Sequence, residues 1–166
     1  RLVGGYVLIA LLMAGVGAFT LQNLRTIQSS DDRLYKRVAK PLGELETISA
    51  SFQRMRASIR DALLTDDQEM QETYLKLLGE RRREVEAAAK DYESGIFTKE
   101  GRALFDDFLE AWGFYVAEMD EVSRVLRAGT REEAQEALIN AIPRENTARD
   151  RIRRLVDRKV DAGKES

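Results

Sequence analysis

The chain has 166 residues, 27 basic and 29 acidic residues for a formal net charge of -2, and neither Cys nor His. The missing Cys and His exclude a disulfide framework, a Cys/His zinc or haem site, and enzymes that depend on a His base. A near-neutral charge argues against nucleic-acid binding, which requires a basic surface. The length suits one ordinary domain, and a charged fraction of 34% with 2 Pro predicts long helices with solvated faces.

The N-terminal segment differs from the rest of the chain. No charged residue lies between Arg1 and Arg25, and residues 2–19 read LVGGYVLIALLMAGVGAF. A helix over these uncharged residues is about 35 Å long, enough to cross the hydrocarbon core of a membrane. We therefore expect a transmembrane helix over residues 1–24 and a highly charged, tethered domain over residues 25–166.

A cleaved signal peptide is the alternative for this segment, because Val16-Gly17-Ala18 has the small residues of a cleavage site. The apolar helix continues past this site and leads into a helical pattern. An uncleaved anchor is therefore the favoured interpretation.

An apolar stripe with spacings of 3 and 4 predicts a long first helix after the anchor. We expect Pro41 to kink this helix rather than end it, because the stripe keeps its phase across the proline. The helix is predicted to be continuous with the transmembrane segment. Its stripe consists of Leu34, Val38, Leu42, Leu45, Ile48, Phe52, Met55, Ile59 and Leu63.

The second helix is predicted to begin after Thr65, which forms a capping-box pattern with Gln68. Its central section, residues 80–86, is densely charged and is expected to face water. Its apolar positions are Met70, Tyr74, Leu77, Leu78, Val85, Ala88 and Tyr92.

The third helix has the most regular pattern, and Thr98 is its predicted N-cap. Its aromatic stripe could line a cofactor pocket, but we expect a packed core instead, since large apolar side chains usually lie in the interior. The stripe consists of Phe105, Phe108, Trp112, Tyr115, Met119, Val122 and Leu126.

The fourth helix is predicted to follow Gly129, a helix C′ residue, and to begin with a capping box of Thr130 and Glu133. Pro143 is expected to produce a kink or a restart within it. Its apolar positions are Ala134, Leu138, Ala141, Ala148, Ile152, Leu155, Val156 and Val160.

Four amphipathic segments with short connections predict an all-α fold, an antiparallel up-down-up-down four-helix bundle. In such a bundle the first and fourth helices are neighbours. Residues 25–63 hold eight basic and five acidic residues, a balance of +3, and residues 143–160 hold seven and three, a balance of +4. Residues 66–93 hold five and nine, a balance of -4, and residues 99–127 hold four and seven, a balance of -3. Two basic helices are therefore expected to share one edge.

This basic edge is a candidate anion-binding site, because guanidinium groups bind carboxylates through two parallel hydrogen bonds. The alternative is that the basic helices only form ion pairs with their acidic neighbours. Arg56 and Arg60 are the strongest candidates, because they lie four residues apart on one helical face beside the apolar seam. The arginines of the edge are Arg54, Arg56 and Arg60 on the first helix and Arg144, Arg149, Arg151, Arg153 and Arg154 on the fourth, with Ser49, Ser51, Gln53, Ser58, Asn146 and Thr147 among them.

Several motifs of this chain resemble the sensor region of bacterial methyl-accepting chemotaxis proteins. They include an anchor that opens with Arg1-Leu2-Val3-Gly4-Gly5-Tyr6, a first helix with Lys40-Pro41-Leu42-Gly43-Glu44-Leu45, and the stretch from Arg54-Met55-Arg56 to Leu63-Leu64. The turn Thr65-Asp66-Asp67 and the connection Arg127-Ala128-Gly129 with Glu132-Glu133-Ala134 continue the resemblance.

The resemblance implies a periplasmic bundle, anchored in the bacterial inner membrane, that forms a homodimer through its first and fourth helices. A small anionic ligand, an organic acid or an amino acid, would bind near the dimer interface. The implied ligand contacts are Arg54, Arg56 and Arg60 on the first helix and Thr147 on the fourth, and Arg151 of the basic edge joins them.

In this interpretation the ligand displaces the fourth helix, and the chain is not an enzyme and has no catalytic residue, cofactor or metal. The same bundle also occurs on histidine kinases and nucleotide cyclases, so the output module stays open. Sensing through a periplasmic binding protein is one alternative. A structural, membrane-anchored bundle that binds a partner protein is another.

Overall fold

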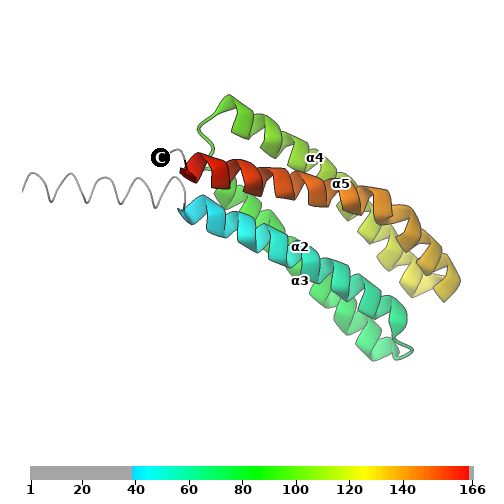
Figure 1. Cartoon of the computed structure of the whole chain (residues 1–166). Helices are drawn as coiled ribbons and strands as arrows, with labels where there is room; N and C mark the ends of the chain where they lie inside the picture. Colours follow the sequence, from blue (N-terminus) through cyan, green and yellow to red (C-terminus); the bar gives the residue numbers. More distant parts are fainter. Residues whose placement is uncertain (1–38, 165–166) are drawn as a thin grey trace, which may run out of the picture.

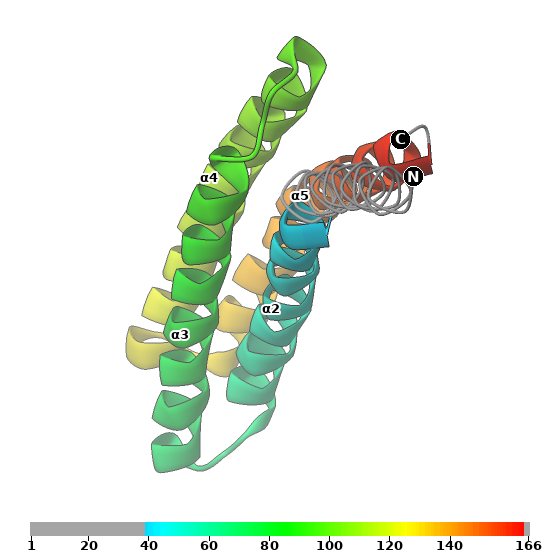
Figure 2. The same ribbon diagram turned by 90° about the vertical axis from the view of Figure 1, so that its left-hand side faces the viewer.

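The computed structural model describes residues 39–164, and these residues form four long helices. The helices are α2 (Lys40–Leu64), α3 (Gln68–Glu93), α4 (Lys99–Ala128) and α5 (Arg131–Lys164). They form two antiparallel hairpins, α2 with α3 and α4 with α5, and the hairpins join along α2 and α5 (Figure 1). The start of α2 and the end of α5 lie at the same end of the bundle in both views (Figure 2). The predicted up-down four-helix bundle is confirmed for this part of the chain.

The predicted transmembrane helix over residues 1–24, and its continuity with the first helix, lie outside the described residues. Between residues 39 and 164, no helix is both long and apolar enough to cross a membrane. Pro41 lies in the first turn of α2, where its missing N–H costs no helical hydrogen bond. Ala39 already has helical backbone angles, with φ -65° and ψ -48°.

The core contains most residues of the predicted apolar stripes. Leu45, Ile48, Phe52, Met55 and Ile59 of α2 are each at most 1% exposed. They pack against an aromatic ladder on α4, where the ring centroids of successive neighbours among Phe105, Phe108, Trp112 and Tyr115 are 5.9, 6.3 and 5.9 Å apart. The ring of Phe52 lies 5.0 Å from that of Tyr115 and joins α2 to the ladder. The aromatic stripe of the third helix is therefore packed core, as predicted.

The helix starts agree with the sequence at two of three positions. Thr98 caps α4 by accepting a hydrogen bond from Gly101, and Thr130 and Glu133 form the predicted reciprocal capping box. The predicted Thr65–Gln68 box is wrong, because Asp67 caps α3 instead. Its Oδ1 accepts from the backbone N–H groups of Glu69 at 2.9 Å and Met70 at 3.2 Å. The carboxylate of Asp67 is two residues closer to these N–H groups than Thr65, so it accepts their hydrogen bonds in place of Thr65.

Gly129 ends α4 for a reason other than a left-handed backbone. Its φ of -113° and ψ of -161° are open to any residue. A Cβ at this position, however, would lie 2.6 Å from Oε2 of Glu133 and 3.1 Å from the carbonyl oxygen of Val125. A larger residue at this position would push Glu133 out of the capping box of α5 and crowd the last turn of α4.

The helix α5 runs without interruption from Arg131 to Lys164, so the predicted restart at Pro143 does not occur. Pro143 has no backbone N–H, so one carbonyl of the preceding turn lacks its helical hydrogen bond. Pro143 is exposed, and water can reach that carbonyl. Ala141 and Ala148 on either side of it are buried on the same face. Packing on that face holds the helix together across the proline.

The charged section over residues 80–86 does not face water throughout, contrary to the prediction. Val85, a predicted apolar position within it, is fully buried as expected. Glu84 turns toward α2, where the buried hydroxyl of Ser51 donates a hydrogen bond to it at 2.6 Å. Met70 at 43% and Val160 at 38% exposure also lie outside the core, because both are near helix ends.

We predict that Phe108→Ala lowers the free energy of unfolding by about 3–5 kcal/mol, because it removes a fully buried ring and leaves a cavity. Phe97→Ala is the matched control, since this ring is 75% exposed, and it should change stability by less than about 0.5 kcal/mol. Urea denaturation followed by circular dichroism measures both values. Equal losses in the two variants would contradict the described core.

Asp67→Ala should cost about 1 kcal/mol through loss of the α3 cap. Gln68→Ala, the neighbouring change at a residue that the sequence wrongly placed in a capping box, should stay within about 0.5 kcal/mol. The same urea measurement compares them. A larger effect at Gln68 than at Asp67 would restore the capping box inferred from sequence.

Candidate functional site

A strip of polar side chains follows the contact between α2 and α5, and we call it the α2–α5 face. On α2 it contains Ser49, Gln53, Arg56 and Arg60, whose spacings of three and four residues place them on one side of the helix. On α5 it contains Glu145, Arg149 and Arg153. The helices are antiparallel, so Arg60 and Glu145 lie toward the loops at the far end and Ser49 and Arg153 toward the ends of the described chain.

A buried ion pair joins the two helices at the loop end of this face. Nη2 of Arg56 lies 2.5 Å from Oε1 of Glu145, and Nη2 of Arg60 lies 3.4 Å from Oε2. The side chains of Arg56 and Glu145 are 16% and 6% exposed, whereas that of Arg60 is 47% exposed. Arg56 also donates to Gln53 at 2.5 Å. Glu145 thus pairs with both arginines that the sequence ranks highest as anion ligands.

Two further donors lie unused next to the ion pair. The hydroxyl of Tyr115 and Nε of Arg56 are buried and have no hydrogen-bond partner among residues 39–164. Burial raises the pKa of Tyr115 above its usual range, the charge of Glu145 raises it further, and Arg56 and Arg60 partly oppose the shift. The hydroxyl therefore keeps its proton at neutral pH and can donate a hydrogen bond.

A groove of about 170 Å³ lies on the α2–α5 face beside the ion pair. Apolar side chains of both helices line it together with four polar ones. Arg149 donates to Asn146 of its own helix at 2.8 Å, while Arg153 is 80% exposed and lies 3.7 Å from Asp157. Such exposed local contacts are weak, so both guanidinium groups can turn toward an anion. The lining residues are Ser49, Phe52, Gln53, Arg149, Ile152, Arg153 and Val156.

Arg54, a predicted ligand contact, lies on a different side of α2 from Arg56. Two residues along a helix turn the side chain by about 200°, which places Arg54 on the α3 side. There the pKa of Glu84 is lowered, first by the hydrogen bond from Ser51 and also by the charges of Arg81 and Arg54. Ser51, which the sequence assigned to the basic edge, likewise faces α3.

The two predicted contacts on α5 also lie away from the groove. Thr147 is exposed and donates to the backbone carbonyl of Pro143 at 2.9 Å. Arg151 is seven residues from both Arg144 and Arg158, which places the three on one side of the helix. Arg144 and Arg158 contact an aromatic ring and a carboxylate of α4, so Arg151 lies on the α4 side. Of the five predicted ligand contacts, the structure brings together Arg56 and Arg60.

Glu145 is the residue that the sequence analysis missed. The apolar stripe of the fourth helix has a gap of seven residues between Ala141 and Ala148. Glu145 fills that gap with spacings of four and three, so the periodicity places it on the buried face. A lone carboxylate on an apolar stripe between basic residues is the signal that could have identified it.

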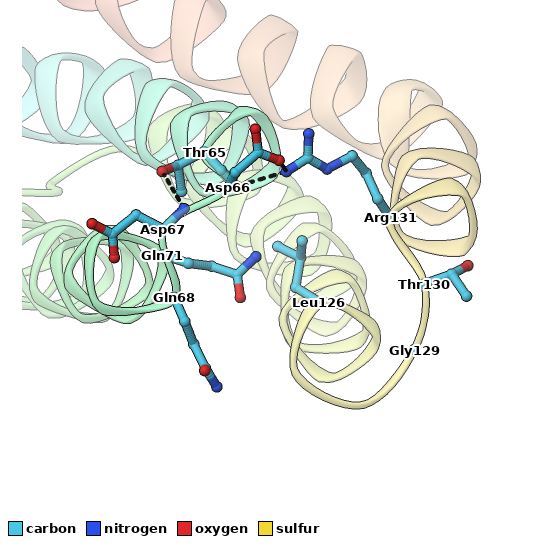
Figure 3. A pocket seen from close by; sticks show the side chains of 9 residues that line it. All are labelled: Thr65, Asp66, Asp67, Gln68, Gln71, Leu126, Gly129, Thr130 and Arg131. Atoms are coloured by element: carbon cyan, nitrogen blue, oxygen red, sulfur yellow. Dashed lines mark hydrogen bonds and ion pairs between the residues drawn. The ribbon is translucent and has the colours of Figure 1, made fainter.

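A second polar pocket, of about 230 Å³, lies where the α2–α3 and α4–α5 loops meet (Figure 3). Arg131 reaches across it from α5, donating to the carbonyl oxygen of Thr65 at 2.7 Å and to Asp66 at 2.6 Å. Leu126 and Gln71 form part of its wall. These contacts connect the ends of the two hairpins, and the guanidinium group in this pocket is already paired.

The comparisons with known proteins agree with this architecture. Residues 1–166 match the family described as a four helix bundle sensory module for signal transduction. No curated protein matches the chain. Among solved structures, a periplasmic sensor domain of a sensor histidine kinase has the same fold, with a TM-score of 0.70 and 14% identity over 82% of this chain and 92% of the other.

We predict that Arg56→Met alone destabilises the chain by about 3–5 kcal/mol, because it leaves Glu145 buried without its closest partner. The double variant Arg56→Met/Glu145→Leu should be close to wild type, since an apolar pair replaces the whole ion pair. Urea denaturation of both single variants and the double variant gives the coupling energy. Strictly additive losses would show that the two side chains do not depend on each other.

Proposed function

The chain belongs to the family of four-helix-bundle sensory modules for signal transduction, and from its α2–α5 face we propose that it is the extracytoplasmic ligand-sensing domain of a bacterial chemoreceptor. It binds a small organic acid or amino acid on this face, in the periplasm. A segment anchored in the inner membrane precedes it.

The observation that carries this proposal is the groove with Arg149 and Arg153 at its rim. Guanidinium groups recognise carboxylates through paired, charge-assisted hydrogen bonds. The floor of the groove is apolar, formed by Phe52, Ile152 and Val156, and can contact the carbon chain of such a ligand. Gln53, which lines the groove, accepts a hydrogen bond from Arg56. A small anion with a short carbon chain fits this combination.

A homodimer that associates through α2 and α5 would place two such grooves near its interface. The remaining predicted contacts Arg54 and Thr147 are exposed on other sides of α2 and α5, where a second copy could meet them. They would contact the ligand when contributed by the second copy. Arg151 would support the same site from the α4 side of α5.

Signalling follows from the antiparallel packing of α2 and α5. A ligand between these helices changes their relative position, and a shift of α5 along or about its axis is carried to the end where the described chain stops. The ligand must bind the two arrangements with different free energies for this shift to occur. The displaced helix, rather than any chemical step, is the output of the module.

A histidine-kinase output is the second candidate. It is favoured by the shared fold with a periplasmic sensor domain of a sensor histidine kinase. The sensing mechanism on the α2–α5 face would be the same in either case, and only the attached output module would differ.

Succinate and aspartate should raise the melting temperature of the purified 166-residue chain in detergent, whereas the uncharged succinamide should not. The fluorescence of Trp112, the single tryptophan, reports unfolding from within the core. At 100 times the dissociation constant the stabilisation is about 2.7 kcal/mol. Combined Arg149→Ala and Arg153→Ala substitutions should remove the shift.

Arg124→Ala is the matched control, because this arginine of α4 is 66% exposed and pairs with Glu121 of its own helix. It should keep the full shift. Stabilisation by uncharged compounds alone would contradict the anion site. A chain that responds to no small molecule would favour recognition of a periplasmic binding protein or another partner protein.

A further inference from the structure

Arg56 and Arg60 form a carboxylate-binding position that a side chain of the protein itself occupies. One oxygen of Glu145 lies 2.5 Å from Arg56 and the other 3.4 Å from Arg60. Beside them, the Tyr115 hydroxyl and Nε of Arg56 are buried donors that Glu145 does not use. The position therefore has more donors than its present occupant satisfies.

We propose that Glu145 is an internal substitute for the ligand, which a carboxylate of the ligand replaces on Arg56 and Arg60. This inference rests on the proposed function, since it concerns an anion bound on the same face. In the exchanged state the ligand carboxylate occupies the position between α2 and α5, and Glu145 turns with α5 toward solvent. Tyr115 then donates to the incoming carboxylate.

The groove provides a route to this position. Its lining residue Gln53 accepts a hydrogen bond from Arg56, so an anion in the groove lies one helical turn from the ion pair. Arg60, with 47% of its side chain exposed, opens the position to water from the other side. A dicarboxylate can place one group at Arg149 and Arg153 and the other at Arg56, whereas a monocarboxylate makes one of these contacts.

The exchange explains how binding would move a helix. An ion pair with low exposure holds α5 in one rotation about its axis, because moving Glu145 away from Arg56 is costly when no other anion compensates the guanidinium charge. Once the ligand supplies that charge, the restraint on α5 is removed. The apparent affinity of the resting protein is the intrinsic affinity multiplied by the fraction of molecules in which Glu145 has already left.

The test is isothermal titration of the full chain with succinate, comparing wild type with Glu145→Gln. If the exchanged state is populated at about 1–10% in the resting protein, removing the internal carboxylate should lower the dissociation constant about 10–100-fold. The control is Glu136→Gln, which makes the same change in net charge at an exposed glutamate of α5. It should change the dissociation constant by less than about twofold. Glu145→Gln should improve the affinity for acetate less than the affinity for succinate.

Each outcome separates the inference from the proposed function. If the wild type binds succinate and Glu145→Gln does not improve the affinity, the exchange is overturned and the sensor proposal stays intact. Binding to Glu145→Gln alone supports the exchange, with Glu145 blocking the resting protein completely. Binding to neither overturns both proposals. If Glu145→Gln does not fold, Glu145→Asp is titrated by the same criterion, because its shorter side chain withdraws the carboxylate from Arg56.

Discussion

The ion pair between Arg56 and Glu145 determines how the two hairpins of this bundle fit together. Burying two charges is costly, and the cost is recovered only when the partners meet in good geometry. That requirement fixes both the axial position and the rotation of α5 relative to α2. Apolar packing alone tolerates small slips, since one leucine or alanine contact can replace another. The buried ion pair therefore specifies one position of α5 relative to α2. Any other position of α5 breaks the pair and differs from the first in free energy.

The rest of the bundle divides into a rigid part and a part that can respond. The aromatic ladder of α4 packs against Phe52 and the other apolar residues of α2, and its loss would cost several kcal/mol. The α2–α5 face has instead a polar strip, a groove and two unused donors. A sensor needs both parts, because a ligand can change the position of a helix only where the alternative packings have similar free energies.

Sequence periodicity predicts most of the fold, because burial repeats every three to four residues and leaves a visible stripe. It predicts the aromatic core of α4, and the three-residue spacing of Thr130 and Glu133 predicts their capping box. It fails where one residue serves a different role from its neighbours. Asp67 rather than Thr65 caps α3, and Pro143 does not interrupt a helix held by packing. The candidate site is only half predictable, since counting charges by helix finds the basic edge but does not show which side of the helix Arg54 or Arg151 occupies. The paired Glu145 escapes a charge count altogether.

The central claim is that the α2–α5 face is a carboxylate-binding face. A crystal structure of the chain grown with saturating succinate tests it most directly. The account predicts succinate in the groove of this face, with at least one carboxylate within hydrogen-bond distance of Arg149, Arg153 or Arg56. Succinate bound only in another part of the molecule, such as the pocket between the loops at Arg131, would contradict the account.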